Sequence, residues 1–297
     1  MPTKKSRQVR RAEERARGAR LASSRGRSSR RPLVLALGSV AVLLLVVGGL
    51  IGVKLAGGGS PEAAGGGGAG RASASVVNSV KSIPPSAFDR VGYQPSVVPP
   101  QRISGKPLVL NGKPQVVYVG AEYCPYCAAE RWAIVTALSR FGTFSKLGAT
   151  HSSTSDVYPD TPTFSFHGAT YTSRYVGLQA VETYTNIADG NSYKPLDTPT
   201  ALEASLASRY DSGGSIPFVD IGNRYMIAGA TYDPALLQGL TMSQVAAALH
   251  DPSSPLCRAV LGTANAVTAA LCQATGGKPS TVCTSPGVTA SAAKLGT

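Results

Sequence analysis

The chain has 297 residues, of which 43% are hydrophobic, and this composition excludes a chain that is disordered throughout. Its five cysteines are too few for a small protein held together mainly by disulfides. The formal net charge of +13 is concentrated in an N-terminal tail. Residues 1–31 contain 12 Lys and Arg and two Glu, a net charge of +10. Residues 32–297 contain 17 Lys and Arg and 14 Asp and Glu, a net charge of only +3. A basic tail beside a nearly neutral remainder does not favour a nucleic-acid partner, and we predict none.

A long apolar run follows the basic tail. Leu33–Val53 contains 21 residues without a charge, and a helix of that length reaches about 31 Å, enough to cross a bilayer. The run and the tail are both longer than in a cleaved signal peptide, which remains the alternative. We therefore assign residues 1–31 to a cytoplasmic tail and residues 32–56 to a single transmembrane helix in contact with lipid. The basic flank places the folded part outside the cell membrane.

Residues 57–101 are predicted to form a flexible linker. Their first 14 positions include eight glycines, a composition that cannot bury enough apolar surface to become ordered. The pairs Pro84-Pro85 and Pro99-Pro100 interrupt the remainder. A short amphipathic helix is expected only near Val76–Val80.

An α/β domain is predicted over residues 102–251, followed by a helical C-terminal extension over residues 252–297. Its apolar periodicities and turn signals indicate alternating strands and helices. In chain order, these are a hairpin (107–119) around the type I′ turn Asn111-Gly112, a helix from Ala128 to Phe141-Gly142, extended chain over 149–178, a helix over 200–210, a hairpin (216–227) around Gly222-Asn223, and helices over 243–250 and 254–275.

Thiol chemistry is indicated by Cys124-Pro125-Tyr126-Cys127, which lies between a strand-like run and an amphipathic helix. A cysteine at a helix N-terminus meets unpaired N–H groups that stabilise its thiolate, so Cys124 is the expected nucleophile. Cys127 lies one turn later and can resolve a mixed disulfide. Two other readings remain open. Half of a zinc site is disfavoured because the three histidines lack ligand spacing, and we predict no metal. An inert disulfide is disfavoured because a CxxC loop is short.

A second candidate feature is Ile216-Pro217, which precedes the predicted strand 218–221. Proline is permitted at the first residue of a strand, and this is the simpler reading. The alternative is a cis-proline beside the dithiol that leaves the Ile216 backbone free to pair with a substrate strand.

These motifs together resemble the thioredoxin superfamily. Within it, the stretches 119–132 and 158–166 are similar to membrane-anchored bacterial thioredoxin-like proteins catalogued as a domain of unknown function, and the resemblance covers about residues 100–285. It implies a thioredoxin-like α/β fold with an extended insertion. It also implies that Cys124 and Cys127 are the redox pair and that Pro217 is the family's cis-proline. We expect no cofactor. Substrate contacts are expected at Pro125, Tyr126, Ile216 and Pro217.

The chain departs from the thioredoxin pattern at one position. Thioredoxins keep a buried carboxylate six residues before the first cysteine, where this chain has Tyr118. The nearest acid is Glu122; a role in proton transfer is open for it, and a surface position is the commoner outcome, which we expect.

The other three cysteines follow the dithiol domain. If residues 254–275 form one helix, Cys257 and Cys272 lie about 22 Å apart, too far for a disulfide. Cys283 can fold back through Gly276-Gly277, so we predict a Cys272–Cys283 disulfide, which agrees with an extracytoplasmic location. Cys257 is then a buried apolar residue, with an intermolecular bridge as the minor option.

The resulting hypothesis is a membrane-tethered, extracytoplasmic thiol–disulfide oxidoreductase. Its partners would be protein thiols or disulfides outside the membrane, with a membrane or soluble redox partner. The alternative is a thioredoxin-like binding or assembly protein without catalysis, and a metal carrier is a weaker third option.

Overall fold

The computed structural model describes residues 69–295. The predicted tail, transmembrane helix and first part of the linker lie outside these residues.

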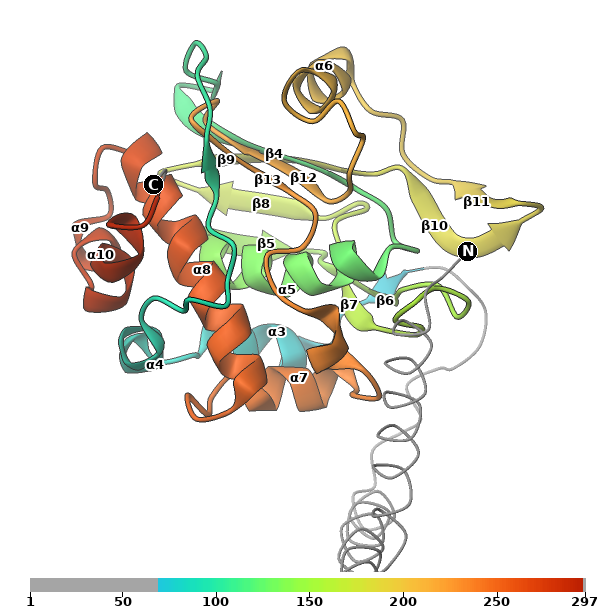
Figure 1. Cartoon of the computed structure of the whole chain (residues 1–297), viewed down its shortest axis with the longest axis horizontal. Coiled ribbons are helices and arrows are strands. Elements are labelled where there is room, and N and C mark those ends of the chain that lie inside the picture. Colours follow the sequence, from blue (N-terminus) through green and yellow to red (C-terminus); the bar gives the residue numbers. More distant parts are fainter. Residues whose placement is uncertain (1–68, 296–297) are drawn as a thin grey trace, which may run out of the picture. The chain divides into compact units, whose positions relative to one another are not determined.

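A mixed sheet forms the centre of the fold (Figure 1). Its order is β2–β13–β12–β4–β3, and β9 also pairs with β4. β4 and β9 are parallel, whereas the other pairs are antiparallel. The strands are β2 (Gln101–Arg102), β3 (Val109–Leu110), β4 (Lys113–Gly120), β9 (Gly177–Glu182), β12 (Phe218–Ile221) and β13 (Tyr225–Ala228).

Two turns predicted from the sequence fix the register of the hairpins. Asn111 and Gly112 join β3 to β4 with φ values of 51° and 74°, as a type I′ turn requires. Gly222 and Asn223 likewise have positive φ values, 65° and 56°, between β12 and β13. Both hairpins of the sequence analysis are therefore confirmed.

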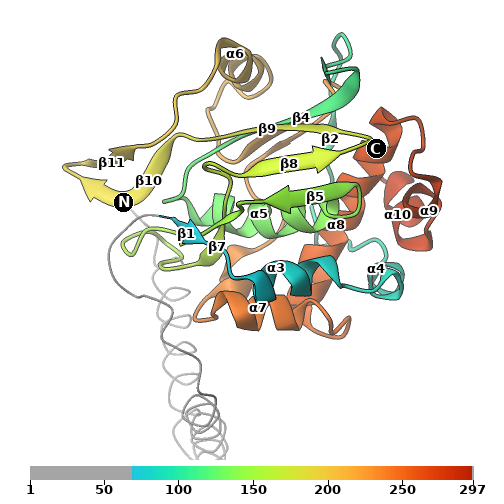
Figure 2. The same ribbon diagram turned by 180° about the vertical axis from the view of Figure 1, so that it is seen from behind.

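Helices cover both faces of the sheet (Figures 1 and 2). α5 (Pro125–Leu138) and α8 (Pro255–Ala274) lie on one face, where Tyr118, Trp132 and Val219 belong to the main core. α6 (Ala201–Tyr210) covers the other face, where Val117 and Leu206 belong to a smaller core. β4 has a continuous apolar run because its alternating side chains are buried on both faces.

Residues 139–176 form an insertion between α5 and β9. It contains β5 (Gly142–Ser145), which pairs with β8 (Thr170–Ser173), and β6 (Gly148–His151), which pairs with β7 (Pro162–Ser165). The extended chain predicted over residues 149–178 is confirmed in outline. A further hairpin, β10 (Tyr184–Asp189) with β11 (Ser192–Pro195), projects from the end of β9.

The predicted flexible linker is wrong for residues 70–91, which are ordered. β1 (Gly70–Arg71) pairs with β6, and α3 (Ala74–Lys81) and α4 (Pro85–Val91) pack against α7 and α8 respectively. The amphipathic pattern near Val76–Val80 does predict α3, whose Val76 and Val80 are buried. The glycines and prolines conceal the order because the covering surface comes from helices that are distant in the chain.

The C-terminal region is helical, as predicted. After a short 3-10 turn, η1 (Pro234–Leu237), it comprises α7 (Met242–Ala248), α8, α9 (Ser280–Cys283) and α10 (Pro286–Ala292). Ser254 is the N-cap of α8 with Pro255 at the first helical position, although the Ser254 side chain makes no capping hydrogen bond. Among the described residues, α8 is the helix long and apolar enough to cross a membrane, but 89% of that window is buried inside the protein.

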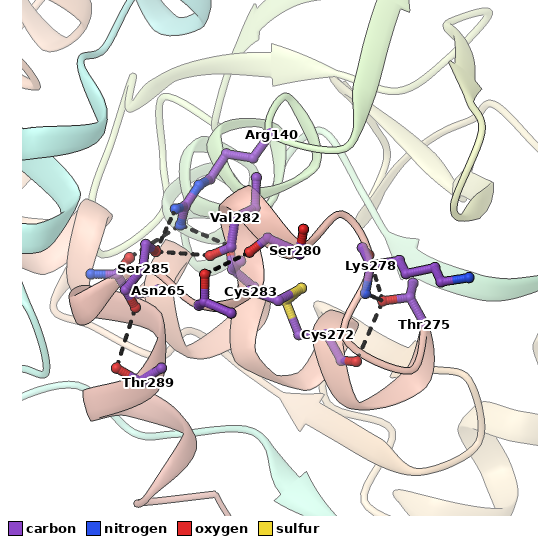
Figure 3. Close-up of a disulfide and its surroundings, with 12 residues drawn as sticks. Arg140, Asn265, Cys272, Thr275, Lys278, Ser280, Val282, Cys283, Ser285 and Thr289 are labelled. Atoms are coloured by element: carbon purple, nitrogen blue, oxygen red, sulfur yellow. Dashed lines mark hydrogen bonds between the residues drawn. A yellow bond between two sulfur atoms is a disulfide. The ribbon is translucent and has the colours of Figure 1, made fainter.

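A disulfide joins α8 to α9 between Cys272 and Cys283, as predicted (Figure 3). Nearby, the Arg140 guanidinium donates to the side chains of Asn265 and Ser285 and lies 4.3 Å from the centre of the Phe88 ring. Arg140 therefore connects the end of α5 with α4, α8 and the start of α10.

Candidate active site at the start of helix α5

The Cys124–Cys127 pair lies where β4 passes into α5. Cys124 is the N-cap residue, Pro125 occupies the first turn, and the Cys127 N–H donates to Cys124 Sγ at 3.3 Å. Proline fits there because the first helical N–H groups have no intrahelical acceptor. Cys127 is fully buried, whereas Cys124 is 5% exposed. The two thiols are unbridged, so Cys124 is the outer thiol of a dithiol.

The surroundings divide the roles of the two thiols. A hydrogen bond from the Cys127 thiol lowers the pKa of Cys124; burial opposes this, while the Cys127 N–H and the Arg131 charge add to it. Burial raises the pKa of Cys127 well above its usual range, and the hydrogen bond to Cys124 adds to this. The thiolate therefore forms first on Cys124, which agrees with the order expected from the sequence.

A buried ion pair lies beneath the dithiol. Arg131, one turn after Cys127, donates from Nε and Nη2 to the two carboxylate oxygens of Glu182, both at 2.8 Å. The same Nη2 donates to the Ala121 carbonyl at 2.6 Å. Both side chains are fully buried, and the charge of Arg131 favours the thiolate of either cysteine. The pair thus supplies fixed charges to a site from which water is largely excluded.

Tyr118, the residue six positions before Cys124, borders this ion pair. Its ring lies 6.0 Å from the Arg131 guanidinium carbon, and its buried hydroxyl has no hydrogen-bond partner in the structure. Burial raises the pKa of Tyr118 well above its usual range, so the phenol stays neutral. Glu182, from the parallel strand β9, is a buried carboxylate that the sequence analysis did not single out.

The surface position expected for Glu122 is wrong. Glu122 is fully buried, and its Oε1 accepts a hydrogen bond from the Ser165 hydroxyl at 2.6 Å. Its backbone N–H donates to the Tyr184 carbonyl, which fixes the segment just before Cys124. The insertion strand β7 and the hairpin β10–β11 cover this segment, and neither contact can be read from the local sequence.

The loop before β12 reaches the dithiol. Cys124 Sγ lies 3.7 Å from the Ile216 carbonyl oxygen, and the Ile216–Pro217 peptide bond is cis. Ile216 is half-buried and Pro217 is buried. The structure therefore brings together Cys124, Ile216 and Pro217 although 92 residues separate the first two.

The other predicted contacts also lie at this site. Pro125 is buried inside the first turn of α5, so it shapes the turn and offers little surface. Tyr126 is 40% exposed, and its ring meets that of Tyr158 edge-to-face at 6.0 Å. In residues 69–295, no cluster of three His, Cys, Asp or Glu side chains could hold a metal ion.

Sequence reasoning missed Arg131, Glu182 and a third buried charge, Glu130. Glu130 Oε2 accepts from the Thr231 backbone N–H and hydroxyl, and burial raises its pKa to about 7. One signal was available: Glu130-Arg131 is the only charged pair inside the otherwise apolar or small-residue helix 125–138. Charges on such a helix are retained only when partners satisfy them.

The fold and site define a mixed α/β protein with a partly shielded dithiol at a helix N-terminus. A family model described as "Domain of unknown function (DUF929)" matches residues 99–201. The matched range includes the dithiol, Arg131 and Glu182, and it ends before Ile216–Pro217 and α8. Neither a curated protein nor a solved structure significantly matches the chain.

Proposed function

We propose that this chain is a thiol–disulfide oxidoreductase with a thioredoxin-like fold, tethered to the cell membrane and facing outward. The observation that carries the proposal is the environment of Cys124, where helix N–H groups, the Cys127 thiol and Arg131 act together to lower the pKa of one outer thiol. The tether and the outward orientation rest on residues 1–56 of the sequence alone.

Chain topology supports the fold assignment. β4, α5 and β9 form a parallel β–α–β unit, and α6 leads to the antiparallel pair β12–β13. The resulting order β9–β4–β12–β13, with the dithiol after β4 and the cis-proline before β12, is the arrangement that the thioredoxin resemblance implies. The small sheets of residues 139–176 are then an insertion into that arrangement.

The chemistry is two successive thiol–disulfide exchanges. The Cys124 thiolate attacks one sulfur of a substrate disulfide, and the other substrate sulfur leaves as a thiolate that takes up a proton. Cys127 then loses its proton and attacks Cys124 Sγ, which releases the second substrate thiolate and leaves a Cys124–Cys127 disulfide. Two electrons pass from the dithiol to the substrate. The reverse sequence oxidises a substrate dithiol, and turnover in either direction needs a second thiol–disulfide partner.

The deciding experiment measures the reduction potential of the Cys124–Cys127 pair in glutathione buffers and the rate at which the reduced protein cleaves a small neutral disulfide. We expect exchange with the native protein and with Cys257→Ala, which removes the other buried free thiol. We expect none with Cys124→Ser. Turnover that survives Cys124→Ser would contradict the proposal.

The low exposure of Cys124 favours a second candidate, a binding or assembly protein that does not use the dithiol catalytically. That function predicts a potential below about −300 mV, as in structural disulfides, together with slow alkylation of Cys124. A higher potential with rapid alkylation contradicts it.

A further inference from the structure

Exposed apolar side chains gather around the dithiol. Six large hydrophobic residues are exposed in the part of the chain that the structure describes, and three of them come from segments bordering Cys124. They are Tyr126 (40% exposed), Val157 (60%) and Tyr184 (37%). Single exposed apolar residues need no explanation, but a group of them at one site indicates a binding surface.

Ring contacts join five tyrosines into two groups, which meet at the segment that carries the dithiol. Tyr126 meets Tyr158 edge-to-face, and Tyr123, beside Cys124, stacks on Tyr193 with ring centres 4.2 Å apart. Tyr123 also meets Tyr184 at 6.3 Å. We call these five side chains the tyrosine rim. It combines α5, the insertion and the hairpin β10–β11, so it exists only in the folded chain.

The loops that carry and adjoin the rim are acidic. Residues 152–160, 211–217 and 229–236 contain four aspartates and no lysine or arginine, and the hairpin β10–β11, which carries Tyr184 and Tyr193, adds Asp189 and Lys194. These segments therefore carry a net charge of −4, although residues 32–297 carry a net charge of +3. The charge of Asp233 raises the pKa of Tyr158, and the charge of Asp156 acts on Tyr123. The local charge is therefore opposite in sign to that of the whole chain.

We infer that the rim selects polypeptide segments in which a cysteine is flanked by Lys or Arg and by an aromatic or aliphatic side chain. This inference rests on the proposed function, because the bound segment must bring its sulfur to Cys124. The aspartates attract the cationic side chain, and tyrosine faces accept both cations and apolar groups. Val157 and Tyr184 supply exposed apolar area on the segments that border Cys124.

The test compares two synthetic cystine peptides of equal length and aromatic content, with either Lys or Glu on both sides of the cysteine. The rate at which the reduced, full-length protein cleaves each peptide is measured at low and high salt, alongside a small neutral disulfide. We expect the Lys peptide to react about 10-fold faster at low salt, and the ratio to approach one near 1 M salt, where charges are screened.

Two variants and a matched control locate the effect. Asp156→Asn and Asp233→Asn keep an acceptor for their local N–H partners, and each should lower the Lys-to-Glu rate ratio by about two- to threefold. Asp251→Asn also keeps an acceptor for its neighbour Ser253, and should leave the ratio unchanged because Asp251 lies in the connection between α7 and α8, outside the loops of the rim.

Equal rates for the two peptides, or faster reaction of the Glu peptide, would overturn this inference. In that case cleavage of the neutral disulfide shows that the proposed function still holds. If the reduced protein cleaves neither the peptides nor the neutral disulfide, the proposed function fails as well.

Discussion

The molecule holds two cysteine pairs at opposite kinds of helix end. Cys124 caps the N-terminus of α5, where N–H groups point toward its sulfur, whereas Cys272 lies in the last turn of α8, where carbonyl groups are exposed. The first pair is unbridged and the second is a disulfide. A helix N-terminus stabilises a thiolate, and a helix C-terminus disfavours it. The position of Cys124 therefore suits a reactive thiol, whereas the position of Cys272 suits a stable cross-link.

The largest expected effect separates the two pairs by activity. Cys124→Ser should lower the rate of disulfide exchange by about a thousandfold or more, because a hydroxyl cannot replace the thiolate. Cys127→Ser should instead accumulate a mixed disulfide, which mass spectrometry detects. The double variant Cys272→Ser/Cys283→Ser is the control and should keep the native rate. A comparable loss in that control would remove the distinction between the two pairs.

The double variant Cys272→Ser/Cys283→Ser also tests how much the disulfide contributes to the free energy of unfolding. The Cys272–Cys283 disulfide closes a loop with a sequence separation of 11 residues. Losing it should lower the free energy of unfolding by about 3 kcal/mol through the entropy of the unfolded chain. Urea unfolding of the two proteins under non-reducing conditions measures this difference. An unchanged midpoint would show that α9 and α10 hold their positions without the cross-link.

Glu130 connects α5, which carries the dithiol, with α8, which carries Cys272. The Thr231 hydroxyl forms hydrogen bonds with both the Glu130 carboxylate and the Thr263 hydroxyl on α8. Burial raises the pKa of Glu130 to about 7, so the folded state binds a proton more tightly than the unfolded state. Stability should therefore fall as the pH rises from the unfolded pKa of about 4.3 through 7. Relative to Glu130→Gln, the native protein should lose about 3 kcal/mol between pH 4 and pH 8.

Thermal unfolding of both proteins across this pH range measures that loss. Glu203→Gln, in the capping box of α6, is the matched control because it changes a buried glutamate far along the chain from the dithiol. Parallel pH profiles for native protein and Glu130→Gln would contradict the assignment of this proton to Glu130.

The smallest expected effect concerns the charges beneath the dithiol. Glu182→Gln removes a negative charge that raises the pKa of Cys127, while Gln can still accept a hydrogen bond from Arg131. The pKa of Cys127 should fall, because the negative charge that opposes its thiolate is gone. Thiolate absorbance as a function of pH measures the shift, with Cys124→Ser as background. An unchanged or raised pKa would contradict an electrostatic effect of Glu182 on Cys127.

The sequence predicted those elements that depend on residues close together in the chain. The Asn111-Gly112 turn, the helix after the dithiol and the C-terminal disulfide all follow from spacing and turn residues. The buried position of Glu122 and its contact with Ser165 could not be predicted, because the covering strand comes from an insertion 43 residues away. The order of residues 70–91 was missed for the same reason: α3 and α4 are held by α7 and α8.

β12 is synthesised long after β4, and this order affects folding during synthesis. β12 lies between β4 and β13, and Val119 pairs with Phe218. While the polypeptide emerges N-terminus first, one edge of β4 stays unpaired until β12 is made, about one hundred residues after β4 ends, although the parallel neighbour β9 is made sooner. An unpaired apolar strand invites pairing with other chains. Nascent chains that end between β9 and β12 are therefore in need of protection from aggregation.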